Sequence, residues 1–225
     1  MDVLLDIDGT LVRTYPIEDE FYDRALGTVG LSLPTTDYEA LGASTDVSIL
    51  RVLARRAWQR DPTPEEIGRV REEHTRAWVE QIRRHGIEPV AGARGVVLEL
   101  RKRGLRFAAA TGGFRVTAAH KLAAAGLDIE IAAAAEDGHD RPELLAHAAG
   151  TASLAAPAAP SLRSPLAETE RPTYVGDGLW DAAAAEHNGL AFIGVAESDE
   201  RAEAFRQRGC RVISDLAQLC DAIAK

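Results

Sequence analysis

Short apolar runs that end in polar or glycine-containing turns recur along this chain. The first occupies residues 3–7 and ends at a turn over residues 8–10. Similar runs occupy residues 107–110, 129–132, 174–175, 191–194 and 212–213. Helical periodicity fills much of the sequence between these later runs, and we expect a terminal helix from about residue 215. Such an alternation of buried strands and helices predicts an α/β fold with a doubly wound parallel sheet.

Residues 15–85 show a different pattern. Apolar side chains there recur every three or four positions, as at Leu50 and Leu53 or Ile67 and Val70, and no convincing strand interrupts them. We therefore expect an α-helical domain at residues 15–88, inserted into an α/β core formed by residues 1–14 and 89–225.

The segment 150–173 breaks the alternation. It contains four prolines among alanine and serine residues and has no periodicity. This composition predicts an exposed, mobile connection without regular structure.

Composition and charge restrict the classes of partner. The chain has 225 residues, of which 46% are hydrophobic and 27% are charged, as in an ordinary globular protein. The 26 basic and 35 acidic side chains give a net charge of -9, which disfavours binding to nucleic acid or to anionic membranes. No apolar run approaches membrane-spanning length, and the acidic N-terminus is not typical of a signal peptide, so we expect a cytoplasmic location.

Carboxylates gather where two of the predicted strands end, which is the edge where ligands bind in open parallel sheets. Asp6 and Asp8 lie at positions i and i+2, so their side chains project from the same side of an extended segment. Asp177 and Asp181 are four positions apart, which one helical turn brings together. Four converging carboxylates would repel unless a divalent cation neutralised them, and a hard, oxygen-rich site suits Mg²⁺.

The predicted strand at 107–110 ends at Thr111-Gly112-Gly113. A hydroxyl followed by two permissive residues at the start of a helix can direct N–H groups toward an anion. An aspartate nucleophile beside a second carboxylate that shuttles a proton is a route to an aspartyl phosphate. Together these motifs indicate phosphoryl transfer.

In this order, the motifs at residues 6–12, Thr111-Gly112 and Gly176-Asp177-x-x-x-Asp181 resemble those of the haloacid dehalogenase superfamily. The resemblance covers essentially the whole chain. The helical insert resembles the cap of phosphoglycolate-phosphatase-like and β-phosphoglucomutase-like members. The resemblance implies a core sheet with the strand order 5-4-1-2-3.

The resemblance also implies roles for individual residues. Asp6 would be the nucleophile, Asp8 the general acid/base, and Thr111 a ligand of the phosphoryl group. Asp177 would hold Mg²⁺ together with the Asp6 carboxylate and the Asp8 main-chain carbonyl, and Asp181 would support the metal directly or through water. We place Thr10, Gly112 and Gly113 among the substrate-binding residues.

The third motif of the family usually supplies a lysine, but this chain has Arg141 within residues 137–143. We expect Arg141 to steady the phosphoryl group. Lys121, on the preceding helix, is the alternative cation and is otherwise interpreted as a solvated residue. We assign no catalytic role to the six histidines, which show no ligand spacing.

The turn at residues 41–46 separates two predicted helices, and Thr45 or Asp46 would cap the second. Members with this type of cap lower such a turn onto the substrate. By that resemblance Ser44, Thr45 and Arg51 are candidates for substrate specificity.

The sequence thus predicts a Mg²⁺-dependent phosphatase that acts on a small phosphorylated metabolite. A 2-haloacid dehalogenase is an alternative, but it needs neither a metal nor the second carboxylate, so Asp8 and Asp177 count against it. These motifs do not separate a phosphatase from a phosphomutase. A catalytically silent binding protein is a further alternative, which the retention of all four acids disfavours. The sequence does not indicate the oligomeric state.

Overall fold

A parallel sheet of six strands forms the centre of this computed structural model, which describes residues 2–154 and 171–223. The strands lie in the order β3-β2-β1-β4-β5-β6. The first five therefore have the expected 5-4-1-2-3 arrangement, and β6 extends the sheet beside β5. Their bounds are β1 Val3–Leu5, β2 Phe107–Ala110, β3 Ile131–Ala133, β4 Thr173–Gly176, β5 Ala191–Val195 and β6 Arg211–Ile213.

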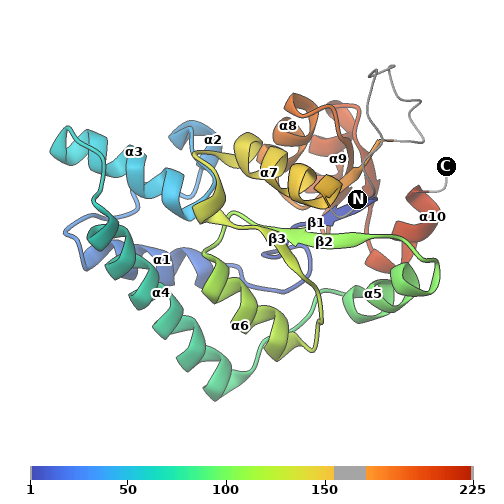
Figure 1. Ribbon diagram of the computed structural model, residues 1–225, viewed down its shortest axis with the longest axis horizontal. Helices are drawn as coiled ribbons and strands as arrows, with labels where there is room; N and C mark the ends of the chain where they lie inside the picture. The colour runs from blue at the N-terminus through green and yellow to red at the C-terminus, as the bar shows by residue number, and fades with distance from the viewer. Residues whose placement is uncertain (1, 155–170, 224–225) are drawn as a thin grey trace.

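Helices cover both faces of the sheet (Figure 1). The α-helices are α1 Ile17–Gly27, α2 Tyr38–Leu41, α3 Asp46–Trp58, α4 Pro64–His85, α5 Ala93–Lys102, α6 Arg115–Ala125, α7 Arg141–Leu154, α8 Leu179–His187, α9 Asp199–Gln207 and α10 Leu219–Ile223. Two 3₁₀ turns, η1 Ala135–Asp137 and η3 Leu216–Gln218, complete the described elements.

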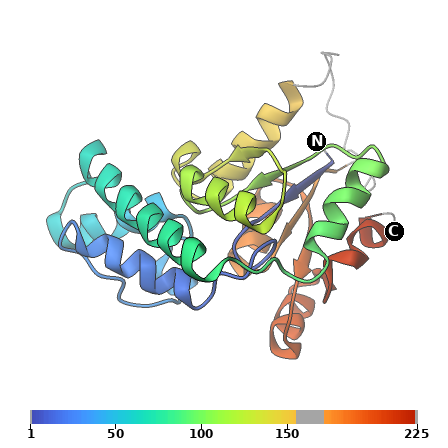
Figure 2. The ribbon, with the colours of Figure 1, turned by 90° about the horizontal axis from the view of Figure 1, so that it is seen from below.

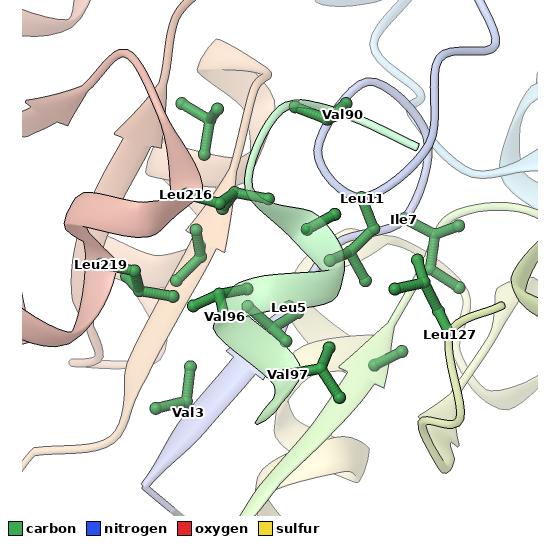
Figure 3. Packing of buried hydrophobic residues seen from close by; sticks show 14 of the residues in the cluster. Val3, Leu5, Ile7, Leu11, Val90, Val96, Val97, Leu127, Leu216 and Leu219 are labelled. Atoms are coloured by element: carbon green, nitrogen blue, oxygen red, sulfur yellow. The ribbon is translucent and has the colours of Figure 1, made fainter. Parts of the chain in front are cut away.

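The alternation of side chains along β1 divides the core into two layers. Val3 and Leu5 pack with α5, α6 and α10 on one face, as Figure 3 shows for Val96 and Leu219. Leu4 lies on the other face, where it packs with α7 and α8. Because both faces of each central strand are buried, the apolar runs are continuous rather than alternating.

Helices α1 to α4 form a group of their own beside the sheet, on the opposite side of the molecule from α5 and α10 (Figure 2). Their apolar stripes enclose a separate core that includes Leu26, Leu50 and Val70. Phe114, which follows β2, is fully buried in this core and links it to the sheet. The division into an insert of residues 15–88 and a core of residues 1–14 and 89–225 stays a prediction.

Two expectations about local structure are corrected. The irregular connection predicted at residues 150–173 is helical at its start, where α7 runs to Leu154, and extended at its end, where β4 begins at Thr173. Residues 155–170 lie outside the described part. The terminal helix expected from residue 215 begins instead as the 3₁₀ turn η3, which the Asp215 side chain caps by accepting from Ala217 N. None of the helices within the described ranges is long and apolar enough to cross a membrane.

Candidate functional site

The carboxyl ends of three neighbouring strands bring the sequence motifs to one place. Asp6 follows β1, Thr111 follows β2 and Asp177 follows β4, and β1 pairs in parallel with both of the others. A cavity of about 50 Å³ lies at this edge of the sheet. It is lined by Asp6, Asp8, Thr111, Gly112, Gly113, Arg141, Asp177 and Trp180, and by Tyr15, Glu18, Tyr38, Ser44, Asp46 and Ile49 from the helical group or the turns beside it.

An acidic cluster lies beside this cavity, and two of its three members, Asp6 and Asp177, line it. One carboxylate oxygen from each of Asp6, Asp177 and Asp181 is within 4.8 Å of the other two. Burial raises the pKa of Asp6 well above its usual value, against the opposing effect of Arg141. Burial and the neighbouring Asp181 raise the pKa of Asp177 to about 7. Such a cluster is destabilised by its own charge and fits a divalent cation, which would restore the ionised forms.

The three acids differ in how the protein satisfies them. The buried Oδ1 of Asp6 has no hydrogen-bond partner among the described residues. Asp177 accepts a hydrogen bond from Thr10 Oγ1 at 3.3 Å. Asp181 is fully engaged, because it accepts from the Tyr174 hydroxyl and from Gly178 N, both at 3.0 Å, and pairs with Arg141. Asp6 and Asp177 are therefore the acids whose oxygens are freer to hold a metal.

Arg141 is the first residue of α7, where the Asp140 side chain caps the helix by accepting from Glu143 N at 2.9 Å. Its side chain is buried, with 6% exposed. Nη2 lies 2.9 Å from Asp181 Oδ1, and Nη1 lies 3.3 Å from Asp6 Oδ1. Within the described chain, Nε and Nη1 have no hydrogen-bond partner. A buried guanidinium with free donors beside a cavity is suited to an anion.

The loop after β2 lies directly against the start of α3. Thr111 is 1% exposed, and its hydroxyl accepts from Gly113 N at 3.1 Å. A Cβ atom on Gly112 would lie 2.6 Å from the Ser44 carbonyl oxygen and 3.0 Å from Arg141 Nη1. Glycine is thus required for this close approach of two backbones.

The three specificity candidates from the turn before α3 and from α3 occupy different places. Ser44 lines the cavity. Thr45 is 1% exposed and caps α3 by accepting from Ser48 N, so its side chain serves the helix. Arg51 lies 2.8 Å from His139 Nδ1 and does not line the cavity. The structure therefore brings only Ser44 of these three to the candidate site.

The expectation that Lys121 is a solvated residue is wrong. Lys121 is 1% exposed, and its Nζ lies 2.6 Å from Asp8 Oδ1 and 2.5 Å from Glu18 Oε2. The ammonium group also lies 4.4 Å from the centre of the Trp78 ring. Position 121 falls on the buried face of α6 together with Ala118 and Leu122, which is the sequence signal for its burial.

Sequence reasoning missed a buried polar network that extends from Lys121. Glu18 Oε1 lies 3.0 Å from His74 Nε2, and His74 Nδ1 lies 3.8 Å from Asp46 Oδ2. Burial alone would raise the pKa of Glu18, but Lys121 and His74 outweigh it and lower this pKa to about 2. Burial raises the pKa of Asp46 to about 7. The network links α1, α3 and α4 to α6 at the edge of the cavity.

An aromatic wall was also missed. Tyr15, Tyr38 and Trp180 line the cavity, and the rings of Tyr38 and Trp180 meet edge to face with centroids 5.4 Å apart. Trp180 follows the metal-motif residue Asp177 by three positions, whereas the two tyrosines come from or beside the helical group. Trp180 could have been noticed from its place inside that motif, but no motif marks Tyr15 or Tyr38, which the fold brings beside it.

Solved structures of similar fold include a hydrolase from Pseudomonas syringae, with 23% identity, a TM-score of 0.69 and coverage of 100% of this chain and 98% of that one. A mutant form of CbbY from Rhodobacter sphaeroides, in complex with xylulose-(1,5)bisphosphate, has 22% identity, a TM-score of 0.70 and coverage of 97% and 95%. For a putative β-phosphoglucomutase from Bacteroides vulgatus the identity is 18%, the TM-score 0.66 and the coverage 96% and 84%. At these identities the likeness shows a shared fold.

A search of curated protein sequences finds no match to this chain. The sequence model of one protein family, the haloacid dehalogenase-like hydrolases, matches residues 3–189. That range includes the acidic cluster, Thr111, Arg141 and the helical group between β1 and β2. Because the match spans most of the chain, the protein belongs to the haloacid dehalogenase-like hydrolase family.

Proposed function

We propose that this protein is a Mg²⁺-dependent phosphatase that hydrolyses a small phosphomonoester through an aspartyl phosphate on Asp6. The observation that carries the proposal is the environment of the Asp6 carboxylate. Its Oδ1 is buried, has no hydrogen-bond partner among the described residues and lies 3.3 Å from Arg141 Nη1, and Asp6 lines a small cavity beside a cluster of acids. A free carboxylate oxygen next to a fixed cation suits a nucleophile that attacks an anionic phosphoryl group.

The metal would be held by the carboxylates of Asp6 and Asp177 and by the main-chain carbonyl of Asp8, with Asp181 supporting the site through water or directly. The unsatisfied Asp6 oxygen and the 4.8 Å spacing of the acids support this assignment. Bound there, Mg²⁺ would supply Lewis-acid stabilisation of the charge on the phosphoryl oxygens.

Two steps complete a turnover. A carboxylate oxygen of Asp6 attacks phosphorus, the bond from phosphorus to the leaving oxygen breaks, and that oxygen takes a proton from the Asp8 carboxyl group. Water then attacks the phosphorus of the aspartyl phosphate and gives a proton back to Asp8, which releases phosphate and restores Asp6. In both steps Arg141 and Thr111 would hold the phosphoryl oxygens.

We also propose that residues 15–88 act as a cap over a core of residues 1–14 and 89–225. The aromatic and acidic side chains that this part contributes to the cavity would then select the leaving group. A small cavity favours a small phosphorylated metabolite, and the net charge of -9 disfavours nucleic acid. The proposal keeps the cytoplasmic location expected from the sequence.

A phosphomutase is the second candidate, because several solved structures of similar fold are described as β-phosphoglucomutases. The two activities share the phosphoenzyme and differ only in whether water or a sugar hydroxyl receives the phosphate.

The test is a panel of phosphorylated metabolites assayed for phosphate release with Mg²⁺ and with EDTA. We expect release from at least one small ester with Mg²⁺ and none with EDTA. A mutase would isomerise a sugar phosphate while releasing little phosphate. Activity toward 2-chloropropionate that persists in EDTA would instead indicate a dehalogenase, and no activity on any compound would favour a binding protein.

A further inference from the structure

A buried ammonium group joins the proposed acid/base to the helical group. Lys121, on α6, contacts Asp8 on one side and Glu18, on α1, on the other. We propose that Lys121 is a positioning residue, which fixes the Asp8 carboxylate in the orientation needed to protonate the leaving group. This inference rests on the proposed function and deepens it, since it concerns how Asp8 performs proton transfer.

The two oxygens of Asp8 have different surroundings. Oδ1 accepts from Lys121 Nζ at 2.6 Å. Oδ2 points toward the loop that lines the cavity, because a Cβ atom on Gly113 would lie 3.4 Å from it. Lys121 therefore engages one oxygen, and the other lies beside the loop that lines the cavity. Without this contact the carboxylate could rotate about its side-chain bonds and lose that orientation.

Lys121 is itself held in place by the helical group. Its second carboxylate partner, Glu18, lies 2.5 Å away and is in turn 3.0 Å from His74 on α4. The aromatic ring of Trp78, also on α4, covers the ammonium group. Because the lysine side chain is 1% exposed, it has no water to replace these partners. The orientation of Asp8 thus depends on the placement of α1 and α4.

Substrates with different leaving groups distinguish a positioning role of Lys121 from a purely structural one. An alkoxide is a poor leaving group, so the bond between phosphorus and an alkyl oxygen breaks only as that oxygen receives the proton from Asp8. Acetate leaves from acetyl phosphate without needing a proton. For both substrates kcat/KM reports the events up to formation of the phosphoenzyme. Misplacing Asp8 should therefore harm an alkyl ester more than an acyl phosphate.

The experiment compares ethyl phosphate with acetyl phosphate, which are similar in size, at saturating Mg²⁺. In Lys121→Met we expect kcat/KM for ethyl phosphate to fall by ~10²-fold or more, and that for acetyl phosphate by less than ~10-fold. Lys121→Gln keeps an N–H donor for Asp8 and should recover part of the loss on ethyl phosphate. The matched control is Thr117→Val, which removes a hydrogen bond of 2.9 Å between α6 and Thr75 on α4, outside the chain of contacts from Asp8 to His74, and should change both substrates by the same factor.

Equal losses on the two substrates in Lys121→Met would overturn the inference and leave Lys121 a structural residue. If Lys121→Met does not fold, Lys121→Gln decides, with a rise of at least ~3-fold in the acetyl-to-ethyl ratio expected and an unchanged ratio contradicting the inference. Failure of both variants to fold would also assign a structural role. If ethyl phosphate is not a substrate, the alkyl ester of the metabolite panel that the wild type hydrolyses best takes its place. Failure of the wild-type protein to release phosphate from any alkyl ester of that panel would contradict the proposed function itself. If the wild type hydrolyses both substrates and the Lys121 variants leave the acetyl-to-ethyl ratio of kcat/KM unchanged, only the role of Lys121 is contradicted.

Discussion

Arg141 is the side chain that balances the acidic edge of the sheet. It lies between Asp6 and Asp181, and we propose that it takes the place of the lysine that the family usually supplies. A guanidinium stays charged even when buried and offers several donors in a fixed plane. Nη2 pairs with Asp181, while Nη1 and Nε keep donors for a phosphoryl oxygen.

Replacing Arg141 by alanine should lower kcat/KM by at least ~10²-fold, because a charge partner of the transition state is lost. Arg141→Lys should recover part of this loss through a shorter, single-point contact. Steady-state phosphate release measures both effects, and Arg101→Ala is the matched control, since Arg101 pairs with the exposed Asp128. Activity of Arg141→Ala within a few-fold of the wild type would show that Arg141 serves only to pair with Asp181.

The sequence predicts which residues meet at the site when each of them directly follows a buried strand. Asp6, Thr111 and Asp177 could be placed together from the sequence because adjacent parallel strands end at one edge. Lys121 was misread because it was judged by its charge rather than by its position on the apolar face of α6. Glu18 shares the buried stripe of Tyr22 and Ala25 and carries the same signal. Such a stripe predicts burial, but the partner on another helix cannot be read from it.

The contact between the loop after β2 and the start of α3 is made by backbone atoms. Asp46 N donates to Gly112 O at 2.8 Å, and Phe114 N donates to Asp46 Oδ2 at 2.9 Å. These two hydrogen bonds fix the turn that contains Ser44 against the cavity. The close fit leaves no space for a side chain at position 112.

Gly112→Ala should therefore lower both activity and stability. The new methyl group would lie 2.6 Å from the Ser44 carbonyl oxygen, so the start of α3 must move. We expect kcat/KM to fall by ~10-fold or more and the free energy of unfolding to fall by about 1–3 kcal/mol.

Urea unfolding and phosphate release check the two effects in Gly112→Ala. The matched control is Gly68→Ala in α4, where a Cβ atom meets nothing within 4 Å and where alanine should stabilise the helix by ~0.5–1 kcal/mol. A Gly112→Ala protein that keeps wild-type activity and stability would show that the loop and α3 are not held in contact.

At the level of elements, strands were easier to predict than helix ends. The run at 107–110 coincides with β2, because its apolar residues end sharply at Thr111. The helical part of 150–154 was missed because it was judged with the prolines that follow, although it continues the alanine-rich sequence of α7. The way in which the turn before α3 meets the loop after β2 depends on backbone hydrogen bonds, which leave no pattern in the sequence.

The whole molecule carries a net charge of -9, and three of its acids, Asp6, Asp177 and Asp181, cluster beyond the ends of β1 and β4. Repulsion among Asp6, Asp177 and Asp181 should destabilise the folded state when no cation is bound. Mg²⁺ should therefore stabilise the folded protein as well as activate it. The order of the strands could be expected from the family resemblance. The distances between the three carboxylates could not, because they depend on how the folded sheet places the strand ends.

Thermal unfolding measures this linkage directly. At a Mg²⁺ concentration about 100 times its dissociation constant, the stabilisation should be about 2.7 kcal/mol, and Tm should rise accordingly. In Asp177→Asn the rise should largely disappear, because a ligand is lost and the repulsion is reduced. An equal rise in Tm for this variant and the wild type would place the metal elsewhere.

The central claim is that the carboxylate of Asp6 attacks phosphorus. The most direct test is phosphate release by Asp6→Asn at saturating substrate and Mg²⁺, with circular dichroism to compare the folds. The amide keeps the shape of the side chain but is not a nucleophile, so we predict the wild-type spectrum and a loss of turnover to background. Correctly folded Asp6→Asn protein with activity within a few-fold of the wild type would contradict the account.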